Sequence, residues 1–192
     1  MDIFDQAVCF AVEKHSGQRR KLSSAPYVLH PLEVAAIVGT MTDDKETLAA
    51  CVLHDTIEDT DTTFEEIVEH FGRRVALLVM TETEDKRPDK PPAATWELRK
   101  EETLLMLQNT SDIAVKMLWL GDKLSNMRSY ARQYRVEGNA LWNTFHQKDP
   151  RRQLWYYERI TECLFELREF PVYQEYVELT NFVFQDFIGR NE

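Results

Sequence analysis

Residues 48–59 read LAACVLHDTIED, an apolar segment that runs directly into His54, Asp55, Glu58 and Asp59. The apolar positions here and elsewhere recur at helical spacing, and no segment alternates convincingly like a strand. In a continuous helix Glu58 stacks over His54 and Asp59 over Asp55, because side chains four residues apart share a face. That face carries an imidazole and up to three carboxylates, and a bound cation would relieve the repulsion between them.

Two further residues are the strongest candidates to complete a coordination sphere. His30 lies in residues 26–31, PYVLHP, which enter a helix, and Asp122 follows the apolar run 117–121, where an unpaired carboxylate is costly. With His54 and Asp55 they form a nitrogen and oxygen donor set that suits manganese, iron, cobalt or zinc better than magnesium. The alternative at this point is an ordinary surface His-Asp pair, with Asp122 serving as a hydrogen bonder between helices.

The pattern of the whole chain predicts an all-α bundle of about eight to ten helices. Pro31 fits a first helical turn, Thr62 and Glu65 form a capping box, and Gly72 ends the helix that runs through Phe71. Later helices are expected at residues 73–82, 95–108, 112–132, 151–169 and 171–188, and the proline-rich segment 85–94 is expected to be a loop.

Composition bounds the domain count, the partners and the location. A chain of 192 residues that is 43% hydrophobic is expected to form one domain over residues 1–192. With 23 basic and 33 acidic side chains the net charge is −10, which argues against nucleic acid as a partner. We expect no membrane association, because no apolar run is long enough to span a bilayer and no leader is evident. Three widely spaced cysteines and the absence of a targeting segment favour a cytoplasmic location.

The order of the motifs resembles the HD-type hydrolase domain of the RelA/SpoT homologues, and especially the short single-domain alarmone hydrolases. The motifs are Arg20-Lys21, the PYxxHP segment that ends at Pro31, HDxxED at residues 54–59, and DKLxN from Asp122. The resemblance covers about residues 4–130, and the helices within 138–189 are expected to pack on that part.

This resemblance implies metal-dependent hydrolysis of the 3′-pyrophosphate of guanosine tetra- or pentaphosphate, giving pyrophosphate and GDP or GTP, with Mn²⁺ as the preferred ion. Glu58 and Asp59 match the pair that positions and deprotonates the attacking water. The residues that match the metal ligands are His30, His54, Asp55 and Asp122. The expected nucleotide contacts are Arg20, Lys21, Asn126 and, more weakly, Ser129, and Lys86 in the proline-rich loop could reach a phosphate.

One departure from the family concerns substrate preference. Trp119 stands where the family has a lysine, and Lys116, one turn earlier, is the candidate to replace that cation. The substrate could instead be NADPH or a nucleoside phosphate, because metal-assisted hydrolysis does not by itself select a base. A protein that binds alarmone without cleaving it is a further alternative. The aromatic C-terminal helices are a candidate interaction surface, with a homodimer as its simplest form.

Overall fold

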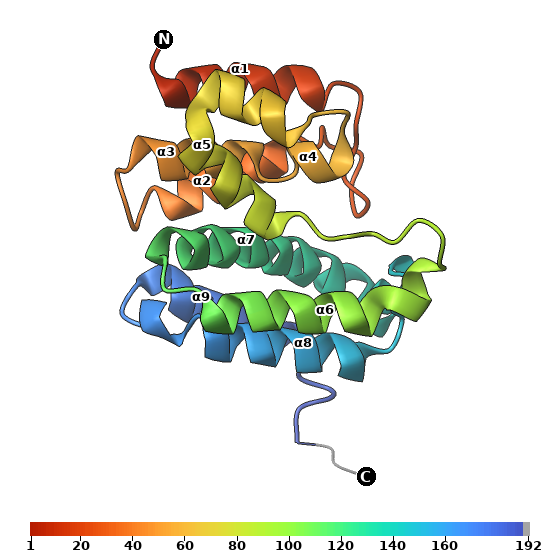
Figure 1. Ribbon diagram of the computed structural model, residues 1–192. Helices are drawn as coiled ribbons and strands as arrows, with labels where there is room; N and C mark the ends of the chain where they lie inside the picture. The colour runs from red at the N-terminus through yellow and green to blue at the C-terminus, as the bar shows by residue number, and fades with distance from the viewer. Residues whose placement is uncertain (190–192) are drawn as a thin grey trace. The chain divides into compact units, whose positions relative to one another are not determined.

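The computed structural model describes residues 1–189 as helices joined by turns and loops (Figure 1). Within these residues there is no strand, only one isolated antiparallel bridge between Arg19 and Pro26. The predicted all-α fold is therefore confirmed. No helix among the described residues is both long and apolar enough to cross a membrane. The chain divides into two compact units, which are described separately; the expectation of a single domain stays a prediction.

The first unit contains Met1–Glu84 and Ser111–Ser125 and is organised around a central helix. That helix is α3 (Lys45–Leu53), which contacts α1 (Ile3–Lys14), α2 (Leu29–Val38) and α5 (Phe64–Glu82). Residues 49–53 of α3 are fully buried. The apolar half of the HDxxED segment therefore forms the core of this unit, and it carries His54 at its end.

The helix predicted to run unbroken through the HDxxED segment is interrupted. The central helix α3 ends at Leu53, and the short helix α4 (Thr56–Asp59) begins two residues later. At this break Nδ1 of His54 lies 2.8 Å from the Cys51 carbonyl oxygen, and Oγ1 of Thr56 donates to the Leu53 carbonyl at 2.7 Å. Side chains thus compete for carbonyls that a continuous helix would use for its own ladder.

The capping box predicted at Thr62 and Glu65 is shifted by one residue. Thr63 is the N-cap of α5, and its hydroxyl accepts from the Glu66 backbone N–H at 3.2 Å. The Thr62 hydroxyl instead lies 2.8 Å from that of Thr60. Gly72 has φ +86° and interrupts α5 with a kink, so the predicted helix over residues 73–82 is the second half of α5.

The long helix α7 (Ile113–Glu137) begins in the first unit and extends past the predicted end at Arg132. Gly121 allows α7 to approach α2 closely, because a Cβ at this position would lie 2.7 Å from Val38 Cγ2 and 3.2 Å from the Val34 carbonyl oxygen. This close approach positions Asp122, the next residue, beside His30 on α2.

The second unit contains Asp85–Thr110 and the chain from Asn126 onward. Its helix α8 (Pro150–Cys163) contacts α6 (Pro92–Asn109), α9 (Pro171–Val183) and the 3-10 helix η2 (Phe165–Leu167), and a second 3-10 helix, η1, spans Gly138–Thr144. The helix predicted over residues 151–169 was too long, because the backbone changes to 3-10 geometry after Cys163. The helix predicted to reach residue 188 ends at Val183.

Candidate metal centre

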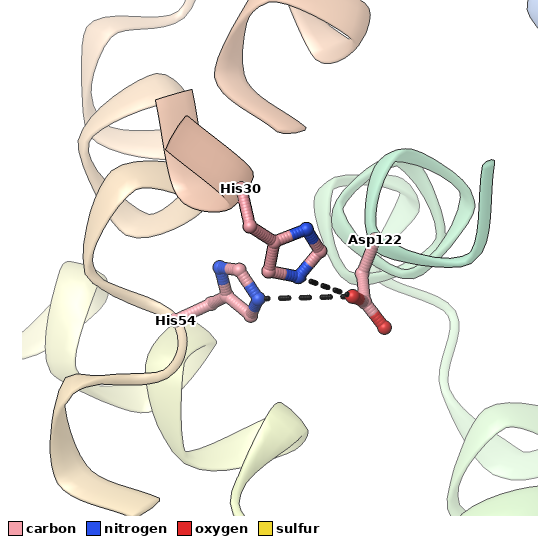
Figure 2. A group of neighbouring side chains, drawn as sticks. All are labelled: His30, His54 and Asp122. Atoms are coloured by element: carbon pink, nitrogen blue, oxygen red, sulfur yellow. Dashed lines mark ion pairs between the residues drawn. The ribbon is translucent and has the colours of Figure 1, made fainter. Parts of the chain in front are cut away.

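Two imidazoles and two carboxylates meet in the first unit, at the break between α3 and α4. Nε2 of His30 lies 3.0 Å from Asp122 Oδ1 and 3.6 Å from Asp55 Oδ2. Nε2 of His54 lies 3.1 Å from Asp55 Oδ2 and 3.8 Å from Asp122 Oδ1. Figure 2 shows the two rings and Asp122 converging from three separate segments, with His54 at the break after α3. The structure therefore brings together the four residues that the sequence offered as ligands.

The hydrogen bond of His54 Nδ1 determines the tautomer of the ring, and therefore which nitrogen is available to bind a metal. The Cys51 carbonyl oxygen can only accept, so Nδ1 of His54 must carry the hydrogen. When the ring is neutral, as a metal ligand must be, Nε2 presents a lone pair toward Asp55 and Asp122. Within residues 1–189 this buried nitrogen has no hydrogen-bond partner.

His30 is oriented in the same way by a chain of two polar residues. The Ser125 hydroxyl donates to Glu33 Oε2 at 2.8 Å, so its oxygen is left to accept from Nδ1 of His30, also at 2.8 Å. Nε2 of His30 therefore also faces the carboxylates with a lone pair. Such partners behind an imidazole are typical of metal-binding histidines, whose tautomer and orientation they fix.

The pKa values show how strongly these groups affect one another. Burial lowers the pKa of the His54 imidazole, but the negative charges of Asp55 and Asp122 outweigh it and raise that pKa to about 10. For His30, burial prevails and its pKa lies below the usual value. Burial acts to raise the pKa of Asp55 and Asp122, yet neighbouring cationic groups, chiefly His54 and Lys123 respectively, hold both pKa values below their ordinary range.

The donor set fits a divalent metal ion. Two nitrogen lone pairs aimed at two carboxylates repel one another unless a positive charge lies between them. His30, His54 and Asp122 are buried, and one ligand atom from each lies within 4.8 Å of the others. Asp55 Oδ2 lies close enough to both imidazoles to be the fourth ligand. These four residues could hold one ion of the transition-metal class.

Glu58 and Asp59 lie on α4, directly after the centre. Oε2 of Glu58 accepts from the Glu84 backbone N–H at 3.1 Å, and the Asp59 carbonyl oxygen accepts from the Gln18 amide at 2.8 Å. The Glu58 carboxylate and the Asp59 backbone are thus held by contacts with segments distant in the sequence.

Tyr27 links Asp55 of the candidate metal centre to Asp59, a contact that the sequence analysis missed. Its hydroxyl lies 2.7 Å from Asp55 Oδ2 and 3.1 Å from Asp59 Oδ2. Burial, with the charges of Asp55 and Asp59, raises the pKa of Tyr27 far above its usual value, so the phenol stays a neutral donor. It has one hydrogen and can donate to only one of the two carboxylates at a time.

The basic pair Arg20-Lys21 lies in the loop between α1 and α2. The Arg20 guanidinium sits over the Tyr27 ring, 5.8 Å from its centroid, so one of the two basic residues lies next to the site. Lys21 is exposed.

The other predicted nucleotide contacts, Lys86, Asn126 and Ser129, belong to the second unit. Lys86 is exposed, and Ser129 accepts from Arg132 at 3.0 Å. The geometry of the metal centre does not place these three residues, and their roles stay predictions.

A second group that the sequence analysis missed surrounds the outer side of Asp122. Lys123 forms a hydrogen bond with Asp122 Oδ2, and its Nζ lies 4.0 Å from Glu82 Oε2 and 4.2 Å from the centroid of the Trp119 ring. Burial raises the pKa of Glu82 well above its ordinary value, although Lys123 opposes that shift. The cation packed on Trp119 is Lys123, one turn later, and the role suggested for Lys116 as a replacement for the family's lysine stays a prediction.

Comparison with known proteins supports the interpretation of the motifs. A family model described as HD domain matches residues 7–149, which is most of the chain. The chain belongs to the HD domain family. The HD domain match includes all four proposed ligands and the Glu58-Asp59 pair.

Curated relatives that contain a similar HD domain agree with the resemblance to the RelA/SpoT homologues. A guanosine-3′,5′-bis(diphosphate) 3′-pyrophosphohydrolase of Aquifex aeolicus is 43% identical over 120 residues, which are 62% of this chain and 16% of that protein. The chain thus spans about a sixth of this relative. The enzyme of the same name, MESH1, from Xenopus tropicalis is 41% identical over 66% of this chain and 69% of its own length.

A solved structure extends the likeness to nearly the whole chain. It is described as a metazoan ortholog of SpoT that hydrolyses ppGpp, and it superposes with a TM-score of 0.70 at 25% identity. The match covers 97% of this chain and 96% of that one. The resemblance inferred from the motifs is therefore confirmed, and it includes the part of the chain beyond residue 130.

Proposed function

We propose that this HD domain is a metal-dependent hydrolase that removes the 3′-pyrophosphate from guanosine tetra- or pentaphosphate. One observation carries the proposal: Nε2 of His30 and Nε2 of His54 converge on Asp55 and Asp122, and the next helix in the chain carries Glu58 and Asp59. A protein that only bound the nucleotide would not need Glu58 and Asp59 in addition to the metal ligands, so this pair favours hydrolysis. The names of the relatives from Aquifex and Xenopus support this substrate.

In the proposed reaction a water oxygen forms a bond to the phosphorus attached to the ribose 3′ oxygen. The bond between that phosphorus and the 3′ oxygen breaks, pyrophosphate leaves, and the 3′ oxygen takes up a proton. A divalent metal held by His30, His54, Asp55 and Asp122 would supply Lewis acidity and lower the pKa of water. Glu58 and Asp59 orient the water and accept its proton, which is a general-base role. Tyr27 positions Asp59 relative to Asp55 through its hydroxyl.

Substrate binding requires a local positive charge, because the chain as a whole carries a net charge of −10. Arg20 beside Tyr27 and the exposed Lys21 are the proposed phosphate contacts from the first unit, and a guanidinium can also stack on a base. Lys86, Asn126 and Ser129 are proposed contacts from the second unit. Positioning and charge neutralisation by these side chains would supply much of the rate enhancement.

The choice of Mn²⁺ is part of this proposal. A site with two imidazoles and two carboxylates suits Mn²⁺, and Fe²⁺, Co²⁺ or Zn²⁺ are the alternatives. A cytoplasmic location and a homodimer built from the aromatic C-terminal helices also stay predictions.

The test is a hydrolysis assay with metal-stripped protein and guanosine tetraphosphate, with and without Mn²⁺, followed by separation of the products. We expect GDP and pyrophosphate only when Mn²⁺ is present. His54→Ala should be inactive because a ligand is lost. Glu58→Gln should bind Mn²⁺ and yet turn over slowly, which separates metal binding from chemistry.

Two other outcomes would point to the alternatives. If guanosine tetraphosphate survives while NADPH or a nucleoside phosphate is cleaved, the metal centre stands and the substrate assignment is wrong. Trp119 stands where the family has a lysine, and this difference is the reason to assay the other substrates. Tight binding of guanosine tetraphosphate without turnover in Mn²⁺ would instead indicate a sensor of the alarmone.

A further inference from the structure

The two carboxylate oxygens of Asp122 have different neighbours. Oδ1 faces the imidazoles of His30 and His54, whereas Oδ2 is hydrogen-bonded to the Lys123 ammonium. Figure 2 shows Oδ1 joined to both rings, with the second oxygen turned away from them. A carboxylate that holds a metal through one oxygen often bridges to a second ion through the other, and in two-metal hydrolases the ions lie about 3.5–4 Å apart. Here an ammonium group already occupies the second oxygen.

Lys123 is a fixed cation and not a mobile surface lysine. It is 9% exposed, and its Nζ lies against Asp122 on one side and 4.0 Å from Glu82 Oε2 on another. The Lys123 ammonium also lies over the face of the buried Trp119 ring, with Nζ 4.2 Å from the ring centroid. Two carboxylates and an aromatic face offset the desolvation of this ammonium, and they restrict it to one position.

Glu82 completes an acidic pair with Asp122 on the outer side of the centre. It is 7% exposed, and among the described residues its Oε1 has no hydrogen-bond partner. Two buried carboxylates close to one ammonium would form a small oxygen site for a metal ion if that ammonium were absent.

We propose that Lys123, held by Glu82 and Trp119, acts as a built-in cation beside Asp122 that excludes a second metal and keeps the centre mononuclear. This inference rests on the proposed metal centre, and it makes Lys123 and Glu82 positioning residues. A lysine with only a structural role would affect stability when replaced, but it would not change the number of ions that the protein binds.

The experiment measures Mn²⁺ binding to the full chain by equilibrium dialysis in excess Mg²⁺, which occupies weak surface sites, with electron paramagnetic resonance as a second readout. We expect the unmodified protein to saturate at one equivalent with the signal of an isolated ion. Lys123→Met should bind two equivalents, with a signal broadened by coupling between the ions. Lys123→Gln provides a second neutral variant if the methionine variant does not fold.

Two controls test the charge argument. Lys123→Arg keeps the cation and should bind one equivalent, and the double variant Lys123→Met, Glu82→Gln lacks the second carboxylate and should also bind one. Two equivalents in the unmodified protein, or one in a folded neutral variant, would overturn the inference. If the unmodified protein binds no Mn²⁺, the proposed metal centre itself is wrong, and that outcome is distinct from the others.

Discussion

The two units of the chain bury different kinds of polar side chain. Among residues 1–189, every buried side chain with a carboxylate, an ammonium or an imidazole belongs to the first unit; these are His15, His30, His54, Glu82, Lys116, Asp122 and Lys123. The buried polar side chains of the second unit are neutral, namely Thr95, Thr103, Gln153 and Thr180. Burying a charge costs several kcal/mol unless it is compensated, so the first unit carries a cost that the second avoids.

The core of the second unit is built instead from aromatic contacts. The Trp142 ring stacks on that of Phe184 with centroids 4.7 Å apart, and the Tyr157 ring lies 5.8 Å from Phe184. Such contacts add stability without placing charge in the interior. The buried ionisable side chains, with three of the four proposed ligands among them, are thus concentrated in the first unit, whereas the nucleotide contacts proposed in the second unit stay predictions.

The largest expected effect comes from removing a ligand in the first unit. Asp122→Ala should abolish Mn²⁺ binding and lower turnover by about a thousandfold or more, because both imidazoles lose a carboxylate partner. Dialysis and the hydrolysis assay measure the two effects. The matched control is Asp186→Ala in the second unit, which removes a carboxylate that accepts from Tyr134 and should leave metal binding intact. Retention of Mn²⁺ by Asp122→Ala would show that Asp122 is not a metal ligand.

A somewhat smaller loss is expected at the proposed water-activating pair. Glu58→Gln and Asp59→Asn should each slow hydrolysis by about 10²–10⁴-fold, the usual contribution of a general base. Mn²⁺ stoichiometry should stay at one, since neither residue is a proposed ligand. Glu175→Gln, which alters the ion pair with Arg128 in the second unit, serves as the control. Unchanged turnover in both site variants would remove the pair from the mechanism.

In the second unit the expected effect is on stability alone. Phe184→Ala should lower the free energy of unfolding by about 3–5 kcal/mol, because it removes a fully buried ring and leaves a cavity beside Trp142. Denaturant unfolding measures this change. The folded fraction should still bind one Mn²⁺, and a loss of metal binding at full folding would show that the two units are not functionally separate.

The sequence predicted which four side chains meet at the candidate centre better than it predicted their surroundings. His54 and Asp55 are adjacent in the sequence. His30 precedes a helix-entry proline and Asp122 follows an apolar run, so each stands out among its immediate neighbours. The break after Leu53 was missed because it depends on side chains that compete for backbone carbonyls. Helical spacing alone carries no signal for that competition.

Contacts between distant segments explain the other omissions. Tyr27 reaches Asp55 and Asp59 across about 30 positions, and Glu82 meets Lys123 across about 40, so no local pattern indicates either contact. Glu82 in particular resembles an ordinary acidic helix end in the sequence, and only its burial distinguishes it. The shift of the capping box from Thr62 to Thr63 was a choice between two adjacent threonines that sequence spacing does not decide.

A moderate effect on packing is expected where α7 meets α2. Gly121→Ala should destabilise the protein by about 1–3 kcal/mol, since the added Cβ would lie only 2.7 Å from Val38 Cγ2. Because the clash pushes Asp122 away from His30, Mn²⁺ affinity should fall with stability. Thermal unfolding with and without Mn²⁺ separates the two effects. A fully stable variant with unchanged affinity would show that the approach of the helices is not needed.

The smallest effect is expected from Tyr27→Phe, which removes one hydroxyl and keeps the ring beneath Arg20. One hydrogen bond to a charged group contributes about 1.5–3 kcal/mol, so turnover should fall by roughly 10–150-fold at unchanged metal stoichiometry. A steady-state comparison of kcat with KM should place the loss in kcat. A change confined to KM would mean that Tyr27 supports substrate binding through Arg20 and does not position Asp59.

The most direct test of the account is anomalous diffraction from crystals grown with Mn²⁺, recorded on both sides of the manganese absorption edge. We predict one peak in the first unit, bonded to Nε2 of His30 and His54 and to carboxylate oxygens of Asp55 and Asp122, with Lys123 still on the outer oxygen of Asp122. A fully loaded crystal with no peak between these four residues, or with its peak elsewhere, would contradict the central claim that they form the metal centre.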